Sequence, residues 1–282
     1  MAAMSEGGFL DVPGGRLHYE AAGAGTPMVL IHAGVANLRM WDEQVPAFAQ
    51  RYHVLRYDTR GYGETQTEHV AFSNRADVAA LLDAAAPGAG PAVVVGLSRG
   101  GQIALDFTLE QPERVAALVF AAGGIGAFDG SVGLPEAERA AAEAYGKASE
   151  EAWEAKAWDL LADIETAWWV DGPGQRPDRV DPAIRAKVHD WILTTYVAEK
   201  EEGLPQPLDP PAAGRLGEVR VPTLVLAGGL DEPATVASCR HLADTVAGAR
   251  YRLFPEVAHM INLERPAEFT RAVLDFLAEV GA

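Results

Sequence analysis

Short apolar runs alternate with longer stretches of helical spacing along most of this chain, and this alternation constrains the fold more than any other feature. Each run is nearly continuous in apolar residues, which indicates strands that are buried on both faces, as in parallel sheets. The stretches near 72–86, 99–110, 234–246 and 264–279 have the spacing of helices. This order predicts an α/β fold with a mostly parallel, doubly wound sheet of about eight strands. The expected strands are 28–32, 53–57, 92–96, 115–120, 223–227 and 250–254, after an opening hairpin of 9–12 and 16–20.

The alternation stops after Phe120 and resumes near Val221, and the segment between them differs in composition. Alanine, glutamate and tryptophan dominate it, and it holds five of the six tryptophans of the chain. Strand-like runs are absent from it, so we expect helices. We therefore predict a helical cap over residues 128–210, inserted into a core domain that comprises residues 1–127 and 211–282.

Charge and cysteine content narrow the class of protein. The chain carries 40 acidic and 23 basic residues, which gives a formal net charge of −17. A body this negative repels phosphate, so nucleic acid and anionic membranes are poor partners. The single cysteine, Cys239, excludes an internal disulfide and a cysteine-rich metal site. With no signal-peptide pattern and no membrane-spanning run, we expect a cytoplasmic protein. We also expect a monomer or homodimer that acts on a small molecule and needs no metal or other cofactor.

The segment Gly96-Leu97-Ser98-Arg99-Gly100 has the pattern G-x-S-x-G between an expected strand and an expected helix. In that context the pattern indicates a nucleophile elbow, a sharp turn that holds a strained serine with its hydroxyl above the sheet edge. Side chains at Gly96 and Gly100 would collide across such a turn. Ser98 is therefore the candidate nucleophile, and the alternative is a helix N-cap serine in a glycine-rich turn.

Five stretches, taken in order along nearly the whole chain, resemble the α/β-hydrolase superfamily and in particular its cap-bearing serine hydrolases. They are His32-Ala33-Gly34 with Trp41 downstream, Asp58 to Gly63, the elbow at Ser98, Gly228 to Asp231, and Ala258-His259 followed by Asn262 to Pro266. The resemblance implies the α/β-hydrolase fold. It also implies a catalytic triad of Ser98, Asp231 and His259, in the chain order that this fold uses.

The chemistry of a serine nucleophile supports this choice of base and acid. A hydroxyl needs a positioned base, and a histidine base needs a carboxylate that fixes its tautomer. His259 follows the last expected strand, where the family carries its base. Asp231 follows the strand at 223–227, and Glu232 beside it is the alternative acid. Some relatives carry the acid one strand earlier, yet residues 121–126 contain no acidic residue.

The resemblance also implies an oxyanion hole made of two backbone N–H groups. One belongs to Arg99, the residue after the nucleophile. We assign the other to Gly34, with Val35 as the alternative, because Ala33 stands where many relatives carry a glycine. The Arg99 side chain has two interpretations: it recognises a substrate carboxylate, or it forms an ion pair with the acidic cap. Asp58 is interpreted as a structural tie of the turn that follows it.

The cap tryptophans lead to a hypothesis about the substrate. They cannot all share one helical face, because two are adjacent and two others are five residues apart. Some would face the core domain and wall a slot for an apolar or aromatic substrate, and the alternative is that they only attach the cap to the core. The candidate pocket residues are His32, Val35, Trp158, Trp168 and Trp169.

Together these residues predict a serine hydrolase that cleaves a small, apolar or aromatic carboxylic ester or lactone through an acyl-enzyme. The same triad would serve a second reaction, hydrolysis of a carbon–carbon bond in a vinylogous diketone. A ligand receptor of this fold with slow turnover is the third interpretation. A serine nucleophile disfavours dehalogenation and epoxide hydrolysis, which need a carboxylate nucleophile.

Overall fold

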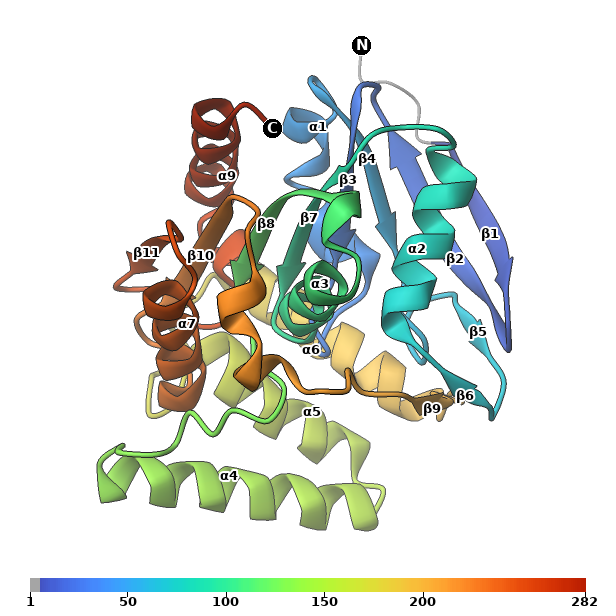
Figure 1. The fold of residues 1–282 in the computed structure, drawn as a ribbon. Coiled ribbons are helices and arrows are strands. Elements are labelled where there is room, and N and C mark those ends of the chain that lie inside the picture. Colours follow the sequence, from blue (N-terminus) through green and yellow to red (C-terminus); the bar gives the residue numbers. More distant parts are fainter. Residues whose placement is uncertain (1–5) are drawn as a thin grey trace.

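The computed structural model describes residues 6–282, and within this range a nine-stranded sheet forms the centre of the molecule (Figure 1). Its strands are β1 (Glu6–Val12), β2 (Gly15–Ala22), β3 (Thr26–Ile31), β4 (Tyr52–Tyr57), β5 (Gln66–Thr67), β7 (Ala92–Leu97), β8 (Val115–Ala121), β10 (Thr223–Gly228) and β11 (Arg250–Phe254). Their order is β1-β2-β4-β3-β7-β8-β10-β11, with β5 paired to β2. The pairs β1–β2, β2–β4 and β2–β5 are antiparallel, and every pair from β4 to β11 is parallel. The mostly parallel sheet is confirmed, and the two-residue β5 is the strand beyond the expected eight.

Helices cover both faces of the sheet, as expected for a doubly wound fold (Figure 1). The helices α2 (Asn74–Ala85), α3 (Arg99–Glu110) and α7 (Pro233–Thr245) contribute to one apolar core, and α1 (Val45–Phe48) and α9 (Pro266–Val280) contribute to the other. Alternate strand residues point into the two cores: Val29 and Val94 face the first, whereas Leu30 and Val95 face the second. This two-sided burial explains why the strands are nearly continuous apolar runs in the sequence.

Side chains and prolines fix the ends of several helices. Ser73 caps α2, because its hydroxyl oxygen accepts a hydrogen bond from the Ala76 N–H at 3.3 Å. Both α7 and α9 begin with a proline at the first helical position, where the missing N–H costs nothing. Short 3₁₀ turns cover Leu38–Trp41, Pro112–Arg114, Ala212–Gly214 and Leu216–Glu218.

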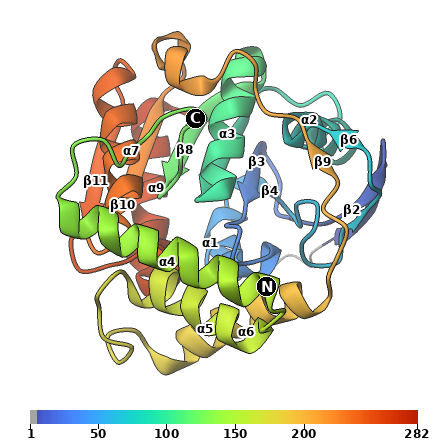
Figure 2. The same cartoon turned by 90° about the horizontal axis from the view of Figure 1, so that it is seen from below.

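The segment between β8 and β10 forms helices that lie together at one end of the sheet (Figure 1). They are α4 (Glu136–Glu154), α5 (Trp158–Thr166), a π-helical turn (Ala167–Asp171) that continues α5, and α6 (Pro182–Val197). Figure 2 looks onto this end of the molecule, with α4 lying across it. Buried residues of this layer, including Ala162, Val170 and Val188, join the core on the α1 and α9 side. The division into core and cap stays a prediction.

One expectation for this segment is wrong, since it does contain a short strand. β9 (Leu204–Pro205) pairs in parallel with β6 (Ala71–Phe72) as a separate two-stranded sheet. Two residues leave no periodic pattern, so the pairing has no signal in the sequence. Among the described residues, no helix is both long and apolar enough to cross a bilayer.

Candidate active site

Ser98 stands between the end of β7 and the start of α3 in a strained backbone conformation. Its φ of 59° and ψ of −122° lie outside the regions that most residues adopt. A side chain at Gly96 would collide with the backbone of Gly100, and one at Gly100 would collide with the backbone of Ile31. The Ser98 N–H donates to the Ala121 carbonyl at 2.8 Å, which ties the turn to β8. The sharp strand-to-helix turn with a strained serine, expected from the sequence, is confirmed, and the role of Ser98 as a nucleophile stays a prediction.

His259 and Asp231 form a buried pair. His259 lies in the loop after β11, just before the short helix α8 (Ile261–Glu264), and Asp231 lies in the loop after β10. The Nδ1 atom of His259 is 2.9 Å from both carboxylate oxygens of Asp231. A carboxylate only accepts hydrogen bonds, so Nδ1 carries a proton, and in the neutral imidazole Nε2 then presents a lone pair. No described residue forms a hydrogen bond with that Nε2.

The structure distinguishes Asp231 from its neighbour Glu232. The Glu232 N–H donates to Asp231 Oδ1 at 2.7 Å, which helps to orient the Asp231 carboxylate. The Glu232 side chain turns instead to Thr235, whose hydroxyl lies 3.1 Å from Oε2. Asp231, and not the alternative Glu232, is therefore the carboxylate that contacts His259.

The Ser98 hydroxyl makes no hydrogen bond with His259 in the part of the chain that the structure describes. The side chain that packs on His259 is Trp169, from the π-helical turn, with the two ring centroids 4.5 Å apart. The Trp169 indole N–H is directed at Glu165 Oε2 (2.7 Å) and at the Tyr145 hydroxyl (2.9 Å). Burial raises the pKa of the Glu165 carboxyl. Helical segments of the expected cap thus hold an aromatic ring over the imidazole.

The loop after β3 brings Gly34 close to the side chain of Arg99. A Cβ atom at Gly34 would lie 3.7 Å from Cδ of Arg99, in ordinary contact. The Ala33 N–H is occupied, because it contacts the Met40 sulfur at 3.2 Å. Within residues 6–282, the N–H groups of Gly34 and Val35 have no acceptor. Both are therefore free to donate to a ligand.

His32 supports this loop and does not line a pocket, which corrects the expectation from the sequence. It is fully buried. Its Nδ1–H donates to the Ala33 carbonyl at 2.7 Å, and its Nε2 accepts from the Thr59 N–H at 2.9 Å. Burial lowers the pKa of His32 to about 4, so the ring is neutral at physiological pH. With both nitrogens bonded, His32 holds the Gly34 loop in place.

The tryptophans proposed for the pocket lie in different surroundings. Trp169 packs on His259, as described above. Trp168 is buried and stacks on Tyr145, with ring centroids 4.4 Å apart. Trp158 packs edge-on against Trp153 at 5.3 Å and also contacts Tyr196. The apolar core shared with α5 and α6 contacts Val35. Among the described tryptophans, Trp169 is the one whose ring reaches His259.

Asp58 and the Arg99 side chain can now be interpreted. Asp58 accepts hydrogen bonds from the N–H groups of Leu38 and Glu64, each at 2.9 Å, which confirms its structural role.

The Arg99 guanidinium donates to the Thr59 hydroxyl oxygen and lies over the Tyr62 ring at 4.9 Å. Within the described chain, no carboxylate forms an ion pair with Arg99, so the interpretation of an ion pair with the acidic cap is wrong.

An ion pair that sequence reasoning missed connects the segment between β8 and β10 to the His259 loop. Arg179 bonds both oxygens of the buried Glu264 carboxylate, at 2.5 and 3.2 Å. The same Glu264 accepts the N–H of Ala258, the residue before His259, at 2.8 Å. Arg179 also donates to the Val170 carbonyl at 2.8 Å, next to Trp169. No sequence spacing predicts a pair separated by 85 residues.

Glu165 was also missed, although a signal for it exists in the sequence. Residues four apart on a helix are neighbours, and Glu165 precedes Trp169 by four. Once Trp169 is a candidate pocket residue, that spacing points to Glu165 as the acceptor for its indole N–H.

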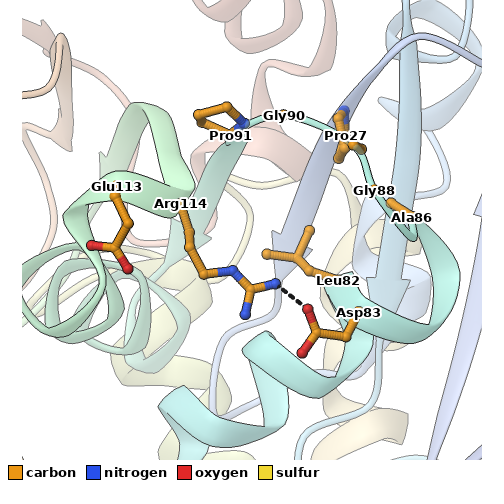
Figure 3. Close-up of a pocket in the computed structure, with 10 residues that line it drawn as sticks. Pro27, Leu82, Asp83, Ala86, Gly88, Gly90, Pro91, Glu113 and Arg114 are labelled. Atoms are coloured by element: carbon orange, nitrogen blue, oxygen red, sulfur yellow. Dashed lines mark hydrogen bonds and ion pairs between the residues drawn. The ribbon is translucent and has the colours of Figure 1, made fainter.

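A separate cavity of about 170 Å³ lies at the opposite end of β7 (Figure 3). Pro27 and Pro91 form part of its wall, together with an ion pair between Arg114 and Asp83 at 2.6 Å. Pro91 and Ser98 are seven positions apart, which corresponds to about 23 Å of extended chain. This cavity is therefore not part of the candidate active site.

Comparisons with known proteins agree with this fold. A family model described as the alpha/beta hydrolase fold matches residues 26–266. The chain is 26% identical to 3-oxoadipate enol-lactonase 1 of Acinetobacter baylyi over 245 residues, which cover 86% of this chain and 84% of the relative. It is 25% identical to the 2-hydroxy-6-oxo-6-phenylhexa-2,4-dienoate hydrolase of Comamonas testosteroni over 282 residues, covering 93% and 91%. The solved enol-lactonase of Burkholderia xenovorans superposes with a TM-score of 0.72 at 28% identity, covering 96% of this chain and all of that one.

Proposed function

The chain belongs to the α/β-hydrolase fold family, and from this premise we propose that it is a serine hydrolase of small carboxylic esters or lactones. One observation carries the proposal: a buried His259–Asp231 pair occupies the loops after β11 and β10, and the strained Ser98 directly follows β7 of the same sheet. The carboxyl ends of parallel strands meet at one edge of a sheet, and ligands bind there in open α/β folds.

In the proposed reaction, His259 Nε2 accepts the proton of the Ser98 hydroxyl as the oxygen attacks the substrate carbonyl. The negative charge that develops on the carbonyl oxygen is stabilised by the N–H groups of Gly34 and Arg99. Asp231 holds the tautomer of His259 and stabilises the imidazolium. The Ser98–His259 hydrogen bond would form in the substrate complex, since such bonds often tighten only there.

The second half of the reaction uses the same groups. The imidazolium of His259 gives its proton to the leaving alkoxide, and the acyl group remains on Ser98. Water then enters, His259 accepts its proton, and the hydroxide attacks the acyl carbonyl. Collapse of this intermediate releases the carboxylic acid and returns the proton to Ser98. The proposed reaction requires no cofactor.

The apolar side chains of Trp169 and Val35 are evidence that the substrate carries an apolar or aromatic group. In this proposal residues 128–210 act as the cap, and Trp169 excludes water from the imidazole.

The names of the Acinetobacter baylyi and Burkholderia xenovorans relatives favour a lactone. A second candidate, hydrolysis of a carbon–carbon bond by the same triad, is supported by likeness to the Comamonas testosteroni hydrolase. A receptor with slow turnover would stall after about one equivalent of ester.

The test is a chain-length series of p-nitrophenyl esters and simple lactones, with wild type beside Ser98→Ala. We expect multiple turnovers and a loss of kcat on the order of 10⁶-fold in the variant. A fluorophosphonate probe should label Ser98 alone, as mapped by mass spectrometry. Labelling of another serine, or full activity of Ser98→Ala, would contradict the proposal.

A further inference from the structure

Arg99 differs from the other arginines that are not exposed to solvent. Nine arginines are buried or partly buried, and eight of them form an ion pair with a carboxylate within 4 Å. Arg99 is the ninth and has no such partner among the residues that the structure describes. The chain has 17 more acidic than basic residues, so a lack of carboxylates does not explain this. Its charge is left unpaired at the residue beside Ser98.

Neutral groups hold the Arg99 side chain in place. The guanidinium donates to Thr59 Oγ1, and the Tyr62 ring lies beneath it at 4.9 Å. The Thr59 hydroxyl is in turn 3.1 Å from His32 Nε2, and His32 Nδ1–H donates to the Ala33 carbonyl. This buried polar chain links Arg99 to the loop that carries Gly34. The guanidinium is therefore positioned without being neutralised.

Most of the guanidinium remains available to a ligand. It has five N–H donors in a planar fork, and the contact with Thr59 uses one of them. Arg99 also lines a cavity of about 250 Å³, whose wall includes Asn74, Gln102 and Gln206. The other charged groups of that wall are Arg75, which is paired with Glu110, and Asp106, which lies seven residues and about 10 Å along α3.

We infer that Arg99 binds a free carboxylate of the substrate, a few bonds away from the carbonyl that Ser98 attacks. The inference rests on the proposed function and narrows its substrate class to anionic esters or lactones. A planar guanidinium fork matches a carboxylate with two parallel hydrogen bonds, which a compact ammonium group does not. In a body with a net charge of −17, an anion needs an unpaired cation of this kind.

The test compares matched anionic and neutral substrates. The anionic set consists of the mono-4-nitrophenyl esters of succinate, glutarate and adipate. Each is measured beside its methyl-capped diester, which has the same chain but no charge. We expect wild type to favour at least one anionic member in kcat/KM, by roughly 10-fold or more. The readout is this anionic-to-neutral ratio for each protein, so a general change in activity cancels.

Three variants complete the design. Arg99→Gln keeps the backbone N–H and should lower the ratio by roughly 10- to 100-fold, the range for a hydrogen bond to a charged group. Arg99→Lys keeps the charge without the fork and should give an intermediate ratio. Arg51→Gln removes one exposed arginine that has no ion pair among the described residues, and it should keep the wild-type ratio. Thermal unfolding of all variants reports whether each one folds.

The outcomes separate the inference from the proposed function. Hydrolysis that depends on Ser98 but shows no preference for the anionic esters would overturn the inference and leave the function standing. Equal losses on both substrate sets in Arg99→Gln, with a lowered Tm, would assign Arg99 a structural role. If no ester is hydrolysed in a Ser98-dependent way, the proposed function fails. Calorimetric titration with glutarate then tests Arg99 directly, since binding that Arg99→Gln does not weaken refutes the inference.

Discussion

The Nδ1 atom of His259 lies 2.9 Å from each carboxylate oxygen of Asp231, and both side chains are buried. This contact gives the imidazole one tautomer and one orientation, because no other described group bonds to the ring. A buried, oriented histidine with a free Nε2 is the group that a serine hydroxyl requires as a base. The role of each residue in the pair can be tested separately.

Asp231→Asn should lower kcat on the order of 10⁴-fold without unfolding the protein. An amide can donate to Nδ1, which would favour the wrong tautomer and place a proton on Nε2. Steady-state kinetics with the best p-nitrophenyl ester would measure the loss. Glu232→Gln makes the same chemical change one residue away and should cause a far smaller loss. Equal losses in both variants would contradict the assignment of Asp231.

Trp169→Ala should lower kcat/KM by roughly 10-fold or more, because water then reaches the imidazole and the apolar wall is lost. Trp158→Ala removes the same side chain from a cluster with Trp153 and Tyr196, away from His259. It should lower the free energy of unfolding by about 1–3 kcal/mol and leave kcat/KM nearly unchanged. Kinetics and thermal unfolding of both variants check this. The reverse pattern would mean that Trp158 lines the pocket.

Gly96→Ala should destabilise the protein by more than about 3 kcal/mol, because the new methyl group would collide with the backbone of Gly100 across the elbow. Gly146 supplies the control, since it lies on the exposed side of α4, where a methyl group added to its Cα would have no other atom within 4 Å. Gly146→Ala should stabilise the protein by about 0.5–1 kcal/mol through helix propensity. Urea unfolding of the two variants gives both values.

Asp106→Asn should stabilise the protein at neutral pH but not near pH 4. Burial raises the pKa of Asp106 to about 6, and its Oδ1 has no hydrogen-bond partner among the described residues. The unfolded chain releases this proton near pH 3.9, so the folded state binds more protons between pH 4 and 6 and loses stability as pH rises. Above pH 6 the full penalty applies, up to about 3 kcal/mol.

Unfolding free energies of wild type and Asp106→Asn, measured from pH 4 to 8, isolate this effect. Buried His32 titrates in the same range with the opposite sign, because its lowered pKa makes the folded state bind fewer protons. It is present in both proteins, so its contribution cancels in the difference. A difference that does not grow with pH would show that Asp106 is not the source.

The fold was predictable from the sequence because a central strand that is buried on both faces consists of consecutive apolar residues, which can be recognised as a run. The strand at 250–254 and the helix at 99–110 were predicted with the bounds that the structure has. The sequence also placed Ser98, since strain and close approach at an elbow demand glycines at fixed spacing. By contrast, β9 has only two residues, and its pairing with β6 depends on how the chain returns from the cap segment.

The surroundings of the site were harder to predict, because they depend on contacts between distant segments. The sequence could not show that His32 uses both ring nitrogens behind the Gly34 loop. It left the Arg99 side chain with two interpretations, and only the absence of an ion pair between Arg99 and any carboxylate of residues 6–282 removed one. Likewise, the sequence does not distinguish the tryptophans between β8 and β10 from one another. Their different surroundings depend on how α4, α5 and α6 pack.

The buried Glu264 carboxylate holds Arg179 on one side and the Ala258 N–H on the other, directly beside His259. Arg179 also donates to the Glu256 carbonyl at 3.1 Å, so the segment between β8 and β10 is tied to the loop that carries His259 at two points. In the proposed function, a substrate too bulky for the space beside Trp169 would displace the turn around Val170 and, through Arg179, pull on the loop that presents the imidazole. Size discrimination in this molecule would then act on turnover as well as on binding.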